Sequence, residues 1–123
     1  FPGGKVDNGD SGLVATALRE ADEEIGLPQD QVTVLGQLPC HETVTGFRVT
    51  PIVAQITGAF APIPEPGEVE EVFTVPLTHL LNADNYRIER RRWRGEWRHF
   101  YIVPYGPYYI WGATARMLRN LAT

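Results

Sequence analysis

The chain has 123 residues, of which 43% are hydrophobic and 21% charged, so we expect a single folded domain over residues 1–123 rather than a disordered or fibrous protein. Its net charge of −4 weighs against a dedicated nucleic-acid partner. The lone Cys40, which we expect to be buried, and the lack of a signal peptide or long apolar run indicate a reducing, cytoplasmic setting without a membrane partner.

The opening segment, residues 1–12, is dense in Gly, Asp and Asn and predicts a loop, with Asp10 or Ser11 placed to cap the following helix. From Leu13 onward, apolar residues recur at spacings of three and four, which predicts an amphipathic helix that ends at Gly26. The apolar face of this helix consists of Val14, Ala17, Leu18, Ala21 and Ile25.

The middle of the chain alternates between predicted strands and turn formers. Residues 32–38 and 46–57 are rich in β-branched side chains, and Pro51 predicts an edge, bend or bulge in the second strand. A proline-rich loop is expected over residues 61–68, because proline cannot donate to a sheet, and a further strand is expected over 69–75.

The last third predicts a short helical turn at residues 77–81, then a hairpin over 85–105 that turns near Arg94 and Gly95. Apolar residues at helical spacing within 109–122 predict a closing helix that includes Ile110. This order of elements favours a sheet covered by helices over an all-β barrel.

The segment READEEIG, residues 19–26, concentrates acids on the first helix. Each helical residue turns by about 100°, so Glu20, Glu23 and Glu24 share one sector beside the apolar face. Like charges at this spacing cost a few tenths of a kcal/mol per pair, roughly, and Arg19 can offset part of that by reaching Glu23. The cluster is either a solvated charged face or a divalent cation site, because Mg²⁺ selects carboxylate oxygens and takes its other ligands from water and substrate phosphates.

Gly4, Asp10 and residues 19–27 together resemble the Nudix box of the Nudix hydrolases. That pattern is a glycine, five residues, an acid, a spacer of seven, then Arg-Glu-apolar-any-Glu-Glu-any-Gly-apolar. Here the acid is Asp10 instead of Glu, and the spacer to Arg19 has eight residues. We therefore expect Asp10 to be a loop or cap residue rather than a metal ligand.

Both departures occur in the branch of the family that hydrolyses coenzyme A, and three further segments, residues 1–5, 66–77 and 109–118, also resemble that branch. The resemblance implies an α/β/α sandwich with a mixed β-sheet between helices. Because the family has one or more strands before the box, it also implies that this chain is an N-terminally incomplete version of a longer protein.

The resemblance further implies roles for the clustered residues. Glu20 and Glu24 would be the main ligands of Mg²⁺ or Mn²⁺, Glu23 would assist at a second ion or its water, and the carbonyl of Gly3 would complete the site. Arg19 would orient Glu23 through a salt bridge. The implied reaction is attack of water on one phosphorus of a diphosphate, with metal ions stabilising the developing charge.

A further acid outside the box is expected to act as a base or an extra ligand. Glu68 and Glu71 match the branch best, although charges that discourage aggregation at a strand edge are an equal alternative for each. If residues 69–75 formed a strand, Glu68 and Glu70 would share one side and Glu71 would take the other.

Three basic residues are candidates for binding substrate phosphate: Lys5, Arg90 and Arg92. For the two arginines, a solvated hairpin is the alternative. Trp93 and Trp97 fit either stacking on adenine or cross-strand packing. The segment at residues 41–47 also resembles a part of the branch that contacts substrate.

The preferred function is hydrolysis of coenzyme A or acyl-coenzyme A to 3′,5′-ADP and 4′-phosphopantetheine or its acyl form. Another nucleotide substrate, such as ADP-ribose, a dinucleoside polyphosphate or an oxidised nucleotide, is the first alternative. A non-catalytic Nudix-like binding module is the second. Acyl preference, the choice of metal and self-association as a homodimer stay open.

Overall fold

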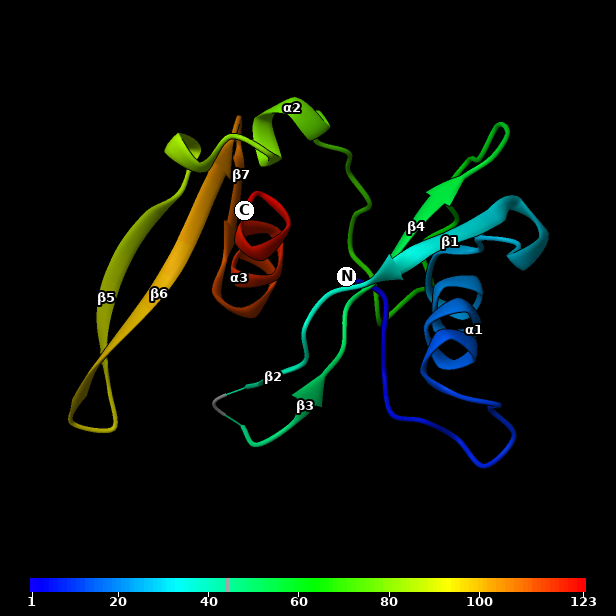
Figure 1. The fold of residues 1–123 in the computed structure, drawn as a ribbon, viewed down its shortest axis with the longest axis horizontal. Helices are drawn as coiled ribbons and strands as arrows, with labels where there is room; N and C mark the ends of the chain where they lie inside the picture. Colours follow the sequence, from blue (N-terminus) through cyan, green and yellow to red (C-terminus); the bar gives the residue numbers. More distant parts are fainter. Residues whose placement is uncertain (44) are drawn as a thin grey trace. The chain divides into compact units, whose positions relative to one another are not determined.

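The computed structural model describes every residue except Val44, that is, residues 1–43 and 45–123 (Figure 1). Val44 belongs to the segment 41–47 that we expect to contact substrate, so part of that prediction lies outside the described residues. The chain divides into two compact units, Phe1–Phe73 and Thr74–Thr123. The assignment of residues 1–123 to a single domain stays a prediction.

The first unit begins with the predicted loop and the predicted helix, α1, Leu13–Ile25. Gly26 ends the helix in the left-handed conformation, with φ 70°, and its N–H donates to the carbonyl of Asp22 at 2.9 Å. A side chain with a Cβ adopts this conformation at a cost, so the glycine sets where the helix stops.

The start of α1 differs from the prediction. Gly12 occupies the N-cap position, and neither Asp10 nor Ser11 caps the helix through its side chain. The Asp10 carboxylate instead accepts from the hydroxyl of Thr16 and from Arg19, one and two turns into the helix. The predicted cap is wrong because a stronger, charged donor competes for the same carboxylate.

The strands of the first unit pair as two antiparallel ladders, and η1, Gln29–Gln31, leads into them. The strands are β1, Val32–Gln37, paired with β4, Ile52–Ile56, and β2, His41–Glu42, paired with β3, Arg48–Val49. The strand predicted over 46–57 is therefore two strands, interrupted at Pro51 as the missing proline N–H predicts. Cys40, expected to be buried, is exposed just before β2.

The proline-rich loop is confirmed, but the strand predicted over residues 69–75 is wrong, because those residues take no regular secondary structure. A strand needs a neighbour for its backbone groups, and β-branched composition alone does not supply one. The loop instead runs along the end of α1, where the N–H of Ile63 donates to the Ile25 carbonyl at 2.9 Å and that of Glu65 to the Glu24 carbonyl at 2.8 Å.

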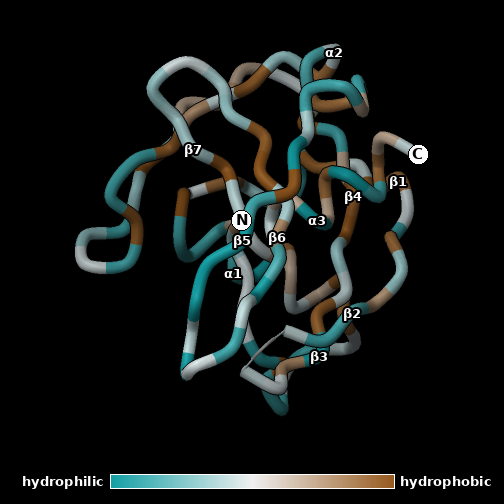
Figure 2. The backbone as a smooth tube through the Cα atoms, turned by 90° about the vertical axis from the view of Figure 1, so that its left-hand side faces the viewer, coloured by the Kyte–Doolittle hydropathy of each residue, from teal (hydrophilic) through white to brown (hydrophobic). Residues whose placement is uncertain are grey.

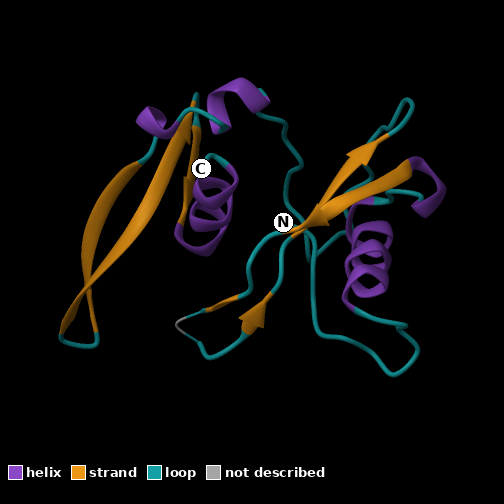
Figure 3. Ribbon diagram, in the orientation of Figure 1, coloured by secondary structure: helices purple, strands orange, loops and turns teal. Residues whose placement is uncertain are grey.

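The second unit contains a three-stranded antiparallel sheet in the order β5, β6, β7 (Figure 3). Its elements are α2, Leu77–Leu80; η2, Ala83–Asn85; β5, Arg87–Trp93; β6, Glu96–Tyr105; β7, Tyr108–Trp111; and α3, Gly112–Leu121. The predicted hairpin is confirmed: Arg94 and Gly95 form its turn, both with positive φ, 51° and 77°, as a tight turn between twisted strands requires.

Helix α3 packs on β6 and β7 and covers the core of this unit. The core cluster is Tyr86, Val103, Ala115 and Leu118. Ile110, predicted to lie in the closing helix, belongs to β7, because a turn at Gly106 first returns the chain alongside β6. The mixture of helices and antiparallel strands confirms the α/β class and is consistent with the Nudix sandwich. In the described part of the chain, every helix is too short or too polar to cross a bilayer.

Replacing Gly26 by alanine should lower the free energy of unfolding by about 1–2 kcal/mol, because a Cβ there requires a left-handed backbone and would lie 3.3 Å from the Cβ of Ile63. Chemical denaturation of both proteins measures the difference. Gly36→Ala is the matched control, since its φ is not positive and a Cβ there meets nothing within 4 Å. Equal stability of Gly26→Ala and the native chain would contradict the role assigned to this residue.

Candidate active site

Arg19 stands at the centre of the candidate site and binds the carboxylate of Asp10 through two parallel contacts. Its Nε lies 3.0 Å from Oδ1 of Asp10, and its Nη2 lies 3.1 Å from Oδ2. Asp10 also accepts from the Thr16 hydroxyl and from the backbone N–H of Asp7, both at 2.8 Å. With only 6% of its side chain exposed, Asp10 is a buried anchor between the opening loop and α1.

These donors fix the charge state of the pair. The hydrogen bond from Arg19, followed by that from the Asp7 N–H, holds the pKa of Asp10 well below its ordinary value of 3.8, against a smaller opposing effect of burial. The Asp10 carboxylate in turn raises the pKa of the Arg19 guanidinium. Asp10 is thus an ionised partner of Arg19, with its carboxylate oxygens already engaged.

The other side of the guanidinium faces the helix acids. Nη1 of Arg19 lies 3.2 Å from Oε2 of Glu23 and 3.3 Å from Oε1 of Glu20. The predicted salt bridge between Arg19 and Glu23 is therefore present, and Glu20 shares it. The carbonyl of Lys5 accepts from Nη2 at 3.3 Å, so one guanidinium joins the opening loop to the acidic face of α1.

Two glycines of the loop lie against the remaining carboxylates. The N–H of Gly3 donates to Oε2 of Glu24 at 3.0 Å, and a Cβ added to Gly4 would lie 2.9 Å from Cδ of Glu20. Any side chain at Gly4 would therefore push the Glu20 carboxylate away. The structure brings Gly3 beside Glu24 through a contact of the Gly3 N–H, and the metal-binding role of the Gly3 carbonyl stays a prediction.

The donor chemistry of this region fits a hard divalent cation. Glu20 and Glu23 approach the same arginine nitrogen, and Glu20 and Glu24 both flank the Gly3–Gly4 backbone. In the side-chain arrangement described for residues 1–43 and 45–123, no three His, Cys, Asp or Glu groups converge on one point. One oxygen each of Glu20 and Glu23 contacts Arg19, and one oxygen of Glu24 accepts from the Gly3 N–H. These oxygens are nonetheless the type that Mg²⁺ and Mn²⁺ prefer.

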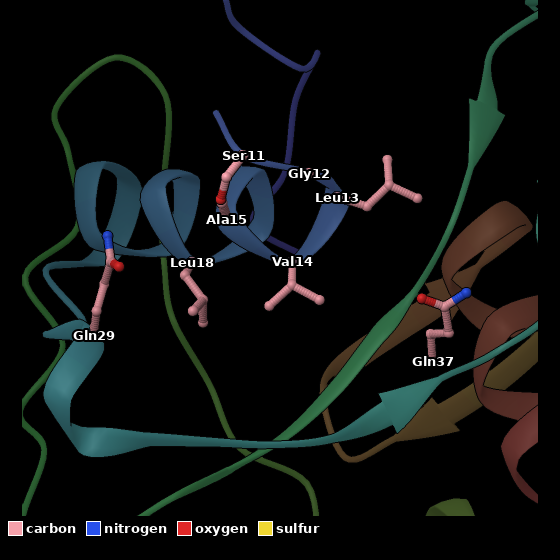
Figure 4. A pocket seen from close by; sticks show the side chains of 8 residues that line it. All are labelled: Ser11, Gly12, Leu13, Val14, Ala15, Leu18, Gln29 and Gln37. Atoms are coloured by element: carbon pink, nitrogen blue, oxygen red, sulfur yellow. The ribbon is translucent and has the colours of Figure 1, made fainter. Parts of the chain in front are cut away.

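A pocket of about 520 Å³ lies on a different side of α1 (Figure 4). Figure 4 shows Val14 and Leu18 projecting from the helix toward β1. The residues that line the pocket are Ser11, Gly12, Leu13, Val14, Ala15, Leu18, Gln29 and Gln37. None of the three glutamates is among them, so this pocket belongs to the apolar side of α1 and is separate from the carboxylate site.

The proline-rich loop approaches the site from the end of α1. The bond from the Glu65 N–H to the Glu24 carbonyl fixes the loop to the helix residue that carries a predicted metal ligand. Glu68 follows in a turn closed by its N–H on the Glu65 carbonyl at 3.2 Å. Glu68 and Glu71 are both exposed, and neither forms an ion pair with a described residue. Because residues 69–75 form no strand, the expected alternation of Glu68, Glu70 and Glu71 does not apply.

The predicted phosphate-binding residues divide between the two units. Lys5 belongs to the first, where its Nζ lies 5.4 Å from the centre of the Phe47 ring and its backbone carbonyl contacts Arg19. Arg90 and Arg92 belong to the second unit, on β5, and both guanidinium groups lie over the ring of Trp97. The structure thus brings Lys5 to the loop of the acidic site and places the two arginines on the hairpin.

Sequence reasoning missed two contributors to the site. We expect Asp10 from the sequence to be a loop or cap residue, and the structure shows it paired directly with Arg19. The signal that could have revealed this pair is the spacing between Asp10 and Arg19 within the box. Thr16 was not singled out, although its side chain is buried and bonds Asp10. A polar residue on the inner side of an amphipathic helix is the feature that could have revealed it.

The loop, the acidic helix and the arginine between them define a Nudix-type site, and comparison with known proteins agrees. Residues 1–96 match the family model described as NUDIX domain, so the chain belongs to the Nudix family. Nudix hydrolases generally use divalent metal ions.

Relatives extend the similarity beyond residue 96. Proteins named "Uncharacterized Nudix hydrolase NudL" from Citrobacter koseri and Klebsiella pneumoniae are 41% and 42% identical to this chain over 122 residues. The same name and 42% identity apply to a protein of Salmonella newport. Each alignment covers 99% of this chain and 64% of the relative, so the chain spans 64% of the length of these proteins.

Replacing Asp10 by asparagine should lower the thermal unfolding midpoint at neutral pH, because Arg19 loses the charge of the carboxylate that it binds through two contacts. The pKa of Asp10 is lower in the folded than in the unfolded chain, so its stabilising effect is present above the ordinary value of 3.8 and declines as the pH falls below it. The midpoints of the native chain and the variant should therefore converge in acid.

Thermal melts of both proteins at neutral pH and near pH 3 test this expectation. Asp22→Asn, at an exposed position of the same helix, is the control and should leave the midpoint at neutral pH nearly unchanged. A gap between native chain and Asp10→Asn that stays constant across this pH range would show that the pair does not act through the charge of Asp10.

Proposed function

We propose that this chain is a Mg²⁺- or Mn²⁺-dependent hydrolase of a nucleotide-type diphosphate, and that coenzyme A or acyl-coenzyme A is its preferred substrate. The observation that carries the proposal is the position of Arg19, which binds Asp10 on one side and Glu20 and Glu23 on the other, beside the glycines of the opening loop. Membership of the Nudix family supports the reaction class. The choice of coenzyme A is supported by the branch-like segments at residues 1–5, 66–77 and 109–118.

The metal would be held by Glu20 and Glu24, with Glu23 at a second ion or its water and the carbonyl of Gly3 completing the site. When bound, a divalent ion neutralises the diphosphate and stabilises the charge that develops on phosphorus. The chain's own contribution is to gather three carboxylates on one helix face, with Arg19 contacting Glu20 and Glu23 and the Gly3 N–H donating to Glu24. Arg19 is a positioning residue in this scheme, because its donors are directed at Asp10, Glu20 and Glu23.

The reaction itself is a hydrolysis. A water oxygen forms a new bond to one phosphorus, the bridging P–O bond breaks, and the departing phosphate keeps the electron pair while the water gives up a proton to a base. For coenzyme A the products are 3′,5′-ADP and 4′-phosphopantetheine. Lys5, which directly follows Gly3 and Gly4 on the opening loop, would neutralise a substrate phosphate through its ammonium group.

Glu68 and Glu71 are the candidates for the base. The backbone bond between Glu65 and Glu24 supports a base on this segment, since it fixes the loop to the helix that carries the metal ligands. Glu68 follows the anchored residue after one turn, and Glu71 lies three residues further along the chain. A carboxylate on this segment is expected to accept the proton of the attacking water.

Two properties of the protein as a whole belong to the same proposal. The exposed, unpaired thiol of Cys40 suits a reducing cytoplasm. Self-association as a homodimer stays a prediction, and gel filtration with light scattering would decide it.

Product analysis of a substrate panel tests the reaction and its specificity. The protein is incubated with Mg²⁺ and with coenzyme A, acetyl-coenzyme A, ADP-ribose, a dinucleoside polyphosphate and an oxidised nucleoside triphosphate. We expect 3′,5′-ADP from the first two and slower turnover of the rest. Preferential loss of ADP-ribose would overturn the substrate assignment, and no turnover of any compound would favour a binding module.

Glu24→Gln tests the metal site in the same assay. Glutamine keeps an acceptor for the Gly3 N–H but loses the charge, so activity should fall by about 100-fold or more, and Mn²⁺ affinity measured by calorimetry should fall with it. Asp22→Asn removes a charge from the same helix at an exposed position and should keep both. Full activity in Glu24→Gln would reject the ligand assignment.

The base is identified by comparing Glu68→Gln with Glu71→Gln. The variant that lacks the base should lose about 10²- to 10⁴-fold in kcat, and the acidic limb of its pH profile should disappear. Glu70→Gln, between them, is the control. If neither variant differs from the control, the base does not lie on this segment.

A further inference from the structure

The hairpin of β5 and β6 has two chemically different faces, which follow from its register. Arg90 pairs with His99 and Arg92 with Trp97, and paired residues of antiparallel strands project on the same side. The residues on this side, named the Arg90 face, are Ile88, Arg90, Arg92, Trp97, His99 and Tyr101. Every residue of β5 is exposed, and Figure 2 shows hydrophilic residues along the hairpin.

The acids of the hairpin lie on the opposite face, where they already have partners. Glu89 accepts from the Tyr109 hydroxyl at 2.7 Å, and Glu96 lies 3.5 Å from the guanidinium of Arg98. The Arg90 face carries no carboxylate of its own. Its positive charge is therefore not compensated within the hairpin, which distinguishes it from a mixed, solvated surface.

Trp97 holds the two arginines of this face in place. The guanidinium carbon of Arg90 lies 4.7 Å from the Trp97 ring centre, and that of Arg92 lies 5.7 Å away. Contact with a ring restrains a guanidinium while its N–H groups stay free to donate. Neither arginine forms an ion pair within residues 1–43 and 45–123, so both guanidinium groups are available to a ligand. Because the contacts with the Trp97 ring orient them before any ligand arrives, the entropic cost of binding is reduced.

The combination of forks and rings specifies a class of ligand. Arginine forks match phosphate oxygens, and an exposed indole offers a plane on which a nucleobase can stack. Trp97 is 53% exposed despite its arginine contacts, and Tyr101 and His99 lie along the same side. We infer that the Arg90 face binds a mononucleotide, with its phosphate groups on Arg90 and Arg92 and its base against Trp97.

This site requires no metal and uses none of the Nudix-box residues, so it extends the proposed function without depending on it. A nucleotide held here by phosphate and base would be bound by groups that take no part in bond cleavage. The hairpin of the second unit would therefore bind a nucleotide without turning it over, and hydrolysis stays assigned to the acidic helix of the first unit.

Calorimetric titration with 3′,5′-ADP in EDTA tests the site apart from hydrolysis. We expect saturable binding that is weaker for adenosine and for inorganic phosphate, because each lacks one half of the recognised chemistry. Arg90→Gln/Arg92→Gln should weaken binding of 3′,5′-ADP by about tenfold or more. Loss of hydrolysis in Glu24→Gln with unchanged binding in EDTA would separate the two sites.

The matched control is Arg87→Gln/Arg91→Gln, which removes the same charge from the opposite face of the same strand. It should change the affinity less than about twofold. If both double variants weaken the binding of 3′,5′-ADP equally, general charge attraction explains the effect, and the proposed site is overturned. Absence of binding to the native chain would overturn it as well.

Two further measurements address fold and ligand source. Arg90→Lys/Arg92→Lys keeps the positive charge but loses the planar guanidinium groups, so it should bind 3′,5′-ADP several-fold more weakly than the native chain. Its melting temperature should be unchanged. An affinity equal to that of the native chain would refute the role of the guanidinium geometry. A short oligoadenylate distinguishes a strand from a free nucleotide. If the oligomer binds more tightly than 3′,5′-ADP and its affinity depends steeply on salt, the ligand of this face is a nucleic-acid strand, and the inference is overturned.

Discussion

The paired contact between Asp10 and Arg19 is the constraint on which the acidic site depends. It ties the opening loop to α1 across nine residues of sequence, and it places the guanidinium where Glu20 and Glu23 also reach it. Without a cation between them, these acids would repel one another near the negative end of the helix dipole. The arginine therefore offsets the repulsion between Glu20 and Glu23 on one helix face, and the buried aspartate side chain keeps the arginine there.

Features set by local chemistry could be predicted from the sequence. The length of α1, the break at Pro51 and the turn at Arg94 and Gly95 each depend on a backbone property of one or two residues. The irregular course of residues 69–75 and the start of α3 could not be predicted, because a strand requires a partner elsewhere in the chain. The expected burial of Cys40 failed for the same reason: exposure depends on what packs nearby.

The candidate site shows the same division between local and distant information. Helical spacing was enough to gather Glu20, Glu23 and Glu24 on one face, and the salt bridge from Arg19 to Glu23 follows from that spacing. The contact of Gly4 with Glu20 required the path of the loop in space. The pairing of the hairpin arginines with Trp97 required the register, since residues on one strand alone do not reveal which side they share with the next.

The strip formed by residues 62–66 has an effect beyond positioning Glu68. Its Ile63 and Glu65 N–H groups satisfy two carbonyls that α1 leaves open at its end, while the alternating residues are Pro62, Pro64 and Pro66, which have no N–H to offer. The outer edge of the strip therefore lacks the donors that would recruit a strand from another molecule. One short segment completes the helix and, through its composition, protects the exposed side of the first unit against edge-to-edge aggregation.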